Sequence, residues 1–187
     1  MAKVRRNIIV EGLSGSLGGQ VVFQQARDGG TIVRVMARPS QRPPSEQQLT
    51  NRARFREAIA YARQTKDHPI YVKKARGTNK TSYNVAVADW FRPPEVVKID
   101  LSQWHGRVGD TLRMQVQDYA YVESVNVLIS DENGQMVETG VATPESNGLW
   151  WQYVTMVDHP GGNGIVVVSA CDLPGHEGSL EVSKQVA

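Results

Sequence analysis

The chain has 187 residues, 40% of them hydrophobic, which is enough for a buried core and excludes a globally disordered protein. Its net charge at pH 7 is only +2, but residues 1–80 hold 16 basic and 5 acidic residues, a net charge of +11, whereas residues 81–187 hold 5 basic and 14 acidic residues, a net charge of −9. This asymmetry indicates a partner of complementary charge.

In the first residues, MAKVRRNIIVEG, only the three apolar side chains of Ile8, Ile9 and Val10 stand between the basic opening and Glu11. This run is too short for the apolar region of a secretion signal, and no later stretch is long enough to cross a membrane. The single cysteine, Cys171, permits no internal disulfide. We therefore expect synthesis in the cytoplasm without a signal peptide and no membrane span, with a virion or an extracellular assembly as candidate final locations.

The first predicted element is a β-hairpin. Residues 20–26 and 31–37 are two β-rich runs, separated by a turn built on Asp28, Gly29 and Gly30. The preceding stretch, GLSGSLGG, lacks the G-x-G-x-x-G spacing of a nucleotide site. It predicts a loop or a bulged strand.

Two helices should follow the hairpin. Ser45 and Gln48 have the spacing of a capping box, which predicts a helix of about 20 residues. Its expected buried stripe consists of Phe55, Ala58, Ile59 and Ala62. Residues 68–80 then read as a short extended segment and a turn. A second helix should begin near Thr81 and stop at Pro93.

From Glu95 onward the apolar residues alternate with period two, and Asn133–Gly134 is a favoured pair for a tight hairpin. About seven short strands, separated by turn residues, predict an antiparallel immunoglobulin-like β-sandwich. The predicted fold is thus α+β, an N-terminal β-hairpin plus two helices followed by the sandwich. Its predicted domains are a basic hairpin-and-helix region, 1–94, and an acidic sandwich, 95–187.

Two segments carry a resemblance. ESVNVLISDENGQMVETGVATPESNGLWWQYVT and VVVSACDLPGHEG resemble immunoglobulin-like or fibronectin type III-like modules of bacterial and phage proteins, although the disulfide pair of antibody domains is missing. This resemblance covers about half of the chain. The segments GSLGGQVVFQQARDGG, RARFREAIAYAR and TSYNVAVADWF resemble small uncharacterised bacterial, phage-like structural proteins. The resemblance implies a protein that presents surfaces and supplies no activity.

No stretch of the sequence predicts catalysis or a bound cofactor. The four histidines are not paired at helical spacing, and G-x-S-x-G, P-loop and H-E-x-x-H motifs do not occur. Cys171 and His176 supply two ligands where zinc needs three or four. The DENGQ turn lacks the later glutamate of a calcium loop. We therefore expect a protein that is not an enzyme and holds no metal or cofactor.

The leading hypothesis is a structural subunit that self-assembles into a particle or filament, phage-like or on a cell surface. A basic region of one copy against an acidic sandwich of the next is a heterologous contact, which repeats into rings or filaments. Pairing of the two charges within one subunit stays open. The interface candidates are Arg38, Arg42, Arg52, Arg54, Arg56, Arg63, Lys73, Lys74, Glu123, Asp131, Glu132, Glu138, Trp150 and Trp151.

Two alternatives remain. The basic half could bind nucleic acid by tracking a phosphate backbone, with Tyr61 and Tyr71 available for base stacking. A surface- or carbohydrate-binding module would instead use Trp104 and the adjacent pair Trp150 and Trp151, of which strand alternation should place one outward.

Overall fold

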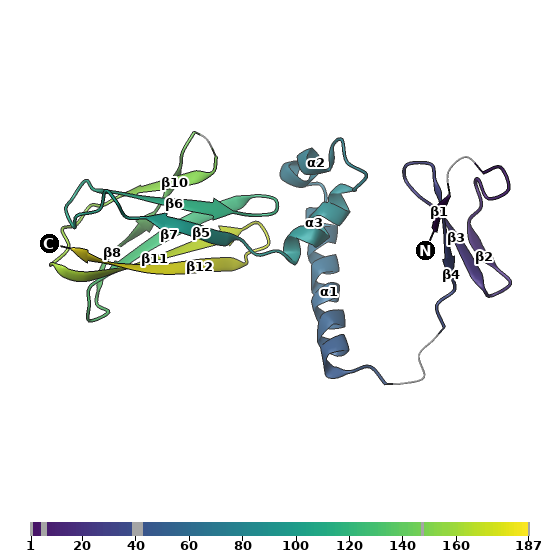
Figure 1. Ribbon diagram of the computed structural model, residues 1–187, viewed down its shortest axis with the longest axis horizontal. Helices are drawn as coiled ribbons and strands as arrows, with labels where there is room; N and C mark the ends of the chain where they lie inside the picture. The colour runs from purple at the N-terminus through teal and green to yellow at the C-terminus, as the bar shows by residue number, and fades with distance from the viewer. Residues whose placement is uncertain (1, 5–6, 39–42, 147, 187) are drawn as a thin grey trace. The chain divides into compact units, whose positions relative to one another are not determined.

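The computed structural model describes residues 2–4, 7–38, 43–146 and 148–186 (Figure 1). The chain divides into two compact units, the first comprising residues 1–55 with 77–79 and the second comprising residues 56–76 with 80–187. Three helices and antiparallel sheets confirm the predicted α+β class.

The first unit contains a small antiparallel sheet of order β1-β4-β3-β2. Its strands are β1 (Ala2–Val4), β2 (Gly15–Leu17), β3 (Val21–Gln25) and β4 (Thr31–Val35). The predicted hairpin is confirmed as β3 and β4, and its turn is set by Gly29, whose φ of 79° suits glycine. The glycine-rich stretch supplies β2, and β1 was not predicted.

Helix α1 spans Glu46–Thr65, as the capping box predicts. The Ser45 hydroxyl accepts a bond from the Gln48 backbone N–H at 3.3 Å, and the Gln48 side chain accepts one from the Ser45 N–H at 3.1 Å. The predicted buried stripe holds at Ala58 and Ala62, which are fully buried. It is wrong at Phe55, which is 50% exposed.

Helix α2 (Pro69–Ala75) occupies a segment that was predicted to be extended. That prediction was wrong because Pro69 sits at the start of the helix, where a missing N–H costs nothing and the fixed φ is already helical. Helix α3 (Ser82–Trp90) is confirmed. The Thr81 hydroxyl caps it by accepting a bond from the Asn84 N–H at 3.1 Å.

The predicted β-sandwich is confirmed as two antiparallel sheets of orders β5-β6-β10-β9 and β12-β11-β7-β8 (Figure 1). The strands of the first sheet are β5 (Glu95–Asp100), β6 (Thr111–Gln117), β9 (Thr143–Pro144) and β10 (Trp150–Val154). The strands of the second sheet are β7 (Val122–Ser130), β8 (Met136–Val141), β11 (Gly162–Asp172) and β12 (Glu177–Val186). All seven predicted strands are present, and the two-residue β9 is additional.

Alternate residues of both sheets fill the core between them. Leu112 and Met114 of β6 face the opposite sheet, where Val125, Val127 and Val168 are equally inaccessible to solvent. Trp104, between β5 and β6, is 1% exposed and closes one part of this core. The period-two pattern therefore identified the inward residues correctly.

A second, smaller core lies between the helices and one end of the sandwich. It contains Ala62, Tyr71 and Val85, and partly buried Tyr119 and Leu173 pack against it. The passage from α3 into β5 is also tight, because a Cβ built on Gly178 of β12 would overlap the carbonyl oxygen of Pro94. Residues 56–76 and 80–92 thus pack on the sandwich within one compact unit.

Independent folding of the sandwich stays a prediction. A protein containing only residues 95–187 should keep a β-type circular dichroism spectrum and a cooperative thermal transition, because it retains all residues of the larger core. Its transition should be lower than that of residues 56–187, because Tyr119 and Leu173 lose their helical cover. A helical or non-cooperative excised segment would contradict this prediction.

Candidate functional site

The N-terminal sheet has an apolar face that is only partly covered in the described residues, which we call the donor face. Strand register places Leu17, Val21 and Val35 in one row across β2, β3 and β4, and Phe23 and Val33 in the next row. Leu17 is 66% and Val35 82% exposed. Of the described residues 7–38, only Gly30 and Thr31 are buried. The described residues of this sheet therefore form no buried core of their own, and its apolar face is available for a further layer.

The sheet β12-β11-β7-β8 has a second apolar surface on the side that faces away from the sandwich core, which we call the outer face. Ile165 and Val167 of β11 alternate with core residues and therefore point outward. Val167 pairs with Leu128 of β7, which is 36% exposed. Val141 and Met136 of β8 are 63% and 61% exposed. Apolar side chains thus occupy both faces of this sheet.

The predicted basic residues lie on the surface in two helices and one loop. Arg52, Arg54, Arg56 and Arg63 are exposed on α1, Lys73 and Lys74 are exposed on α2, and Arg38 is exposed after β4. Arg42 lies outside the described residues. Within the second unit, Arg56 and Arg63 stand seven positions apart, on the side of α1 away from buried Ala58. They leave a solvated basic face on this helix.

The predicted acidic residues do not form one patch. Glu123 lies at the start of β7, whereas Asp131 and Glu132 follow its end, about 25 Å away at 3.3 Å per residue. The Asp131 carboxylate accepts bonds from the N–H groups of Asn133 and Gln135, and the bond from Gln135 holds its pKa below the ordinary range. Asp131 therefore stays charged while it shapes the β7–β8 turn.

Glu138 is a correction to the predicted surface acids. It is 7% exposed, and its Oε1 accepts bonds from the Tyr153 hydroxyl at 2.6 Å and from the Met156 N–H at 2.7 Å. Burial, with the bond to Glu138, raises the pKa of Tyr153 to about 12. A carboxylate with this role inside the sandwich cannot pair with an arginine of another copy.

The tryptophans are less available than the glycan hypothesis requires. Trp104 and Trp151 are buried. Trp150 does point outward, as alternation predicted, but the Arg113 guanidinium lies 4.8 Å from its ring centre. Glu145 holds this arginine through two bonds of 2.6 and 2.8 Å. The outward face of Trp150 is therefore part of a cation–π and ion-pair cluster.

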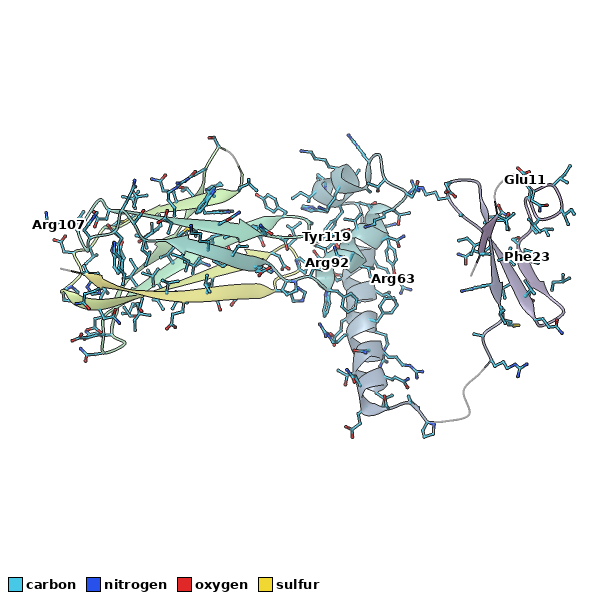
Figure 2. All side chains as sticks on the ribbon, in the orientation of Figure 1. Glu11, Phe23, Arg63, Arg92, Arg107 and Tyr119 are labelled. Atoms are coloured by element: carbon cyan, nitrogen blue, oxygen red, sulfur yellow. The ribbon has the colours of Figure 1, made fainter. Side chains whose placement is uncertain are left out.

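Basic residues from the helical segment converge on Tyr119, in the loop between β6 and β7. Lys74 Nζ and Arg92 Cζ lie 4.6 and 4.4 Å from its ring centre. Lys80 donates to the Tyr119 hydroxyl at 3.2 Å. Figure 2 shows Arg92 beside Tyr119 at the helical end of the sandwich, with Arg107 at the far end. Some of the basic charge is thus used within one subunit.

Beneath this cluster lies a buried chain of hydroxyl and carboxyl groups. The Tyr71 hydroxyl donates to Asp89 Oδ2 at 2.6 Å and lies 2.6 Å from the Tyr61 hydroxyl. Asp89 is inaccessible to solvent, and its burial raises its pKa to about 6. Burial likewise raises the pKa of Asp172, which accepts a bond from the His176 N–H. Tyr61 and Tyr71 are committed to this network, which removes Tyr71 as a stacking platform for bases.

A groove of about 490 Å³ opens on the sandwich beside the loop between β6 and β7. Its lining includes Tyr121, Val122, Pro144, Leu149 and Trp151, together with the carboxylate of Asp118. The walls are largely apolar, and the described residues of the lining include no histidine, cysteine or lysine. The groove offers shape for an apolar group, but its lining does not pair a nucleophile with a base.

In the ranges that the structure describes, no three His, Cys, Asp or Glu side chains are placed to hold a metal ion. None of the described helices combines the length and the apolar character needed to cross a membrane.

The comparisons with known proteins give no family. No protein-family model matches the chain. No curated protein matches it. CopC from Methylosinus trichosporium OB3b is similar to 50% of this chain over 92% of its own length, with 15% identity and a TM-score of 0.38. A tetra-tandem repeat in the extending region of a large adhesion protein matches 50% of this chain over 23% of its own, with 21% identity and a TM-score of 0.36. An engineered protein matches 57% over 26%, with 20% identity and a TM-score of 0.35.

The buried acid Asp89 generates a prediction about pH. Its pKa in the folded protein, about 6, exceeds the value of about 3.9 for an unfolded chain, so folding favours the protonated carboxyl. This contribution is fully present below about pH 4 and is lost as the pH rises through about 6. Lys74, Asp118 and Asp172 face the same carboxyl, so the wild-type profile is a sum of several effects.

Asp89→Asn isolates the effect of this one group. Relative to the wild type, its free energy of unfolding should rise by about 2 to 3 kcal/mol between pH 4 and pH 8, at about 1.4 kcal/mol per pKa unit. Urea titrations at several pH values measure the difference, with Glu57→Gln, at an exposed site on α1, as the control. A constant difference between wild type and Asp89→Asn across this range would contradict the prediction.

Proposed function

We propose that the chain is a non-enzymatic structural subunit that assembles with other copies of itself into a particle or filament, such as a phage-like virion or a cell-surface layer. The observation that carries the proposal is the donor face of the N-terminal sheet, where Leu17 and Val35 are exposed and the other apolar side chains are only half-buried in the described residues. A sheet with one apolar face must pack that face against another layer to be stable.

Burial of the donor face by a partner would lower the free energy of the protein. Covering one exposed valine or leucine side chain stabilises a protein by about 1.5 to 3 kcal/mol. The donor face offers Leu17, Val21 and Val35 in a single row. A layer that covers this row and the next would therefore supply several kcal/mol. The N-terminal sheet is the element that gains most from association.

The charge distribution supports association between copies of this chain. The net charges of +11 and −9 on residues 1–80 and 81–187 attract one another between two copies, and such attraction raises the rate and the selectivity of association. Because the two surfaces are different parts of the chain, the contact is heterologous and leaves one of each free at the ends. Growth into a ring or a filament follows from that geometry.

A second candidate function is nucleic-acid binding, favoured by the solvated basic face of α1 with Arg56 and Arg63. Against it stands the acidic sandwich, which repels the same polyanion. Binding of DNA or RNA that falls steeply with salt, with no change of oligomeric state, would favour this function over assembly.

Deletion of residues 1–38 tests the proposal directly. The full chain should form assemblies whose size increases with concentration, whereas the shortened chain should stay monomeric in sedimentation velocity. Both hydrophobic cores lie beyond residue 55, so the shortened protein should keep its fold and its thermal transition. A full chain that is monomeric at high concentration and low salt would remove the proposal.

Charge reversal tests the electrostatic part. Exposed pairs are each worth about 0 to 1 kcal/mol, so single changes should be nearly silent, whereas the combined change of Arg38, Arg42, Arg54 and Arg63 to glutamate should abolish assembly. Raising salt from 0.1 to 1 M shortens the screening length from about 10 to about 3 Å and should weaken the wild-type assembly. Indifference to both treatments would show that the charges pair within one subunit.

A further inference from the structure

We propose that the donor face of one copy packs on the outer face of the sheet β12-β11-β7-β8 of a second copy. This inference rests on the proposed function and names the two surfaces that meet. Both are faces of antiparallel sheets, and both hold apolar side chains that are exposed or only half-buried in the described residues.

The donor face is the more apolar side of the N-terminal sheet. Val21 and Phe23 are two positions apart on β3 and therefore share one side of the sheet. Their cross-strand partners Val35 and Val33 lie on the same side. The opposite side carries Ser16, Val22 and Arg34 in one row, which is more polar. The face to be covered is therefore defined by strand register.

The outer face is apolar at its centre. The run GIVVVSA in β11 places valine or isoleucine on both sides of the strand, a pattern typical of strands that are covered on both faces. Val167 pairs with Leu128, and Leu128 pairs with Thr139 of β8. Val141 and Met136 add apolar side chains on β8, where they lie opposite the polar residues Asn126 and Ser130. A sandwich strand exposed to water on one side would instead alternate apolar and polar residues.

Sheet-on-sheet packing suits both surfaces. Two sheets pack face to face about 10 Å apart, with their side chains interdigitated. The apolar rows of the donor face match the apolar centre of the outer face, formed by Ile165, Val167 and Leu128, in kind. Polar residues flank that centre in the same rows, with Glu181 opposite Val167 and Thr139 opposite Leu128. The contact adds a third layer to the sandwich of the receiving copy.

Charge selects this pairing over pairing of like faces. Residues 1–38 hold 6 basic and 2 acidic residues, and residues 95–187 hold 4 basic and 13 acidic residues. Two N-terminal sheets would bring net charges of +4 and +4 together, and two sandwiches would bring −9 and −9 together. The mixed contact joins opposite charges, and Glu177 and Glu181 stand exposed on β12 at the border of the outer face.

Two double variants separate the surfaces. The donor variant, Leu17→Glu with Val35→Glu, disables the N-terminal sheet, and the acceptor variant, Leu128→Lys with Val141→Lys, disables the outer face. All four positions are exposed by 36% or more, so the substitutions remove no residue from the described hydrophobic cores. Each variant alone should be monomeric in sedimentation velocity at concentrations where the wild type assembles.

Mixing the two variants is the decisive step. The mixture retains one working donor face, on the acceptor variant, and one working outer face, on the donor variant. It should form one-to-one pairs and grow no further. Matched controls place the same charges elsewhere: Val22→Glu with Gln24→Glu on the other side of β3, and Gln152→Lys with Val154→Lys on the outward side of β10. Both controls should assemble like the wild type.

The other outcomes overturn the inference in distinguishable ways. An acceptor variant that still dimerises alone would show that two donor faces pair with each other. A mixture that stays monomeric, with folded variants by circular dichroism, would show that the donor face docks within its own chain or elsewhere. Variants that assemble like the wild type would sink the inference and leave the proposed function standing. A monomeric wild type would remove both.

Discussion

The structure depends on one constraint: an apolar sheet face must be covered. Inside the sandwich this constraint is met, because Leu112 and Met114 of one sheet are buried against Val127 and Val168 of the other. At the helical end, Tyr71 and Val85 form a second core, against which Leu173 of the turn between β11 and β12 packs. The donor face and the outer face are the two places where the described residues leave this constraint only partly met.

Contacts within one subunit pair only part of the basic charge with the acidic sandwich. Lys74, Lys80 and Arg92 surround Tyr119, and Lys74 stabilises the ionised form of buried Asp89. These contacts fix α2 and α3 to the acidic sandwich. Arg56 and Arg63 have no such role in the described contacts and remain in solvent. Part of the basic charge therefore stabilises this junction, and another part lies on the surface of α1.

Local patterns in the sequence predicted most elements of the fold. The Asp28–Gly30 turn, the capping box at Ser45 and the Asn133–Gly134 turn each act over a few residues, so the sequence alone reveals them. Period-two alternation identified the sandwich because one face of each strand is buried. The segment that begins at Pro69 was misread because proline both breaks helices and starts them.

The candidate site was harder to predict because it depends on tertiary contacts. Glu138 reads as a surface acid, and only the position of Tyr153 and Met156 makes it an internal acceptor. Phe55 fits a buried stripe by spacing, yet its side chain is 50% exposed. The outer face did carry a sequence signal, since GIVVVSA is apolar at consecutive positions. That signal favours cover on both sides of the strand but does not indicate the covering layer.

The close approach of Gly178 to Pro94 bears on how the protein responds to mechanical tension. A force applied to the helical segment reaches the sandwich at Glu95, where the backbone packs closely against β12. The pull then runs along β5, whose hydrogen bonds to β6 extend from Glu95 to Asp100. Bonds loaded along the strand direction resist together, whereas bonds loaded from one end open in succession. A chain anchored in this way would transmit force into the sandwich without first peeling off its first strand.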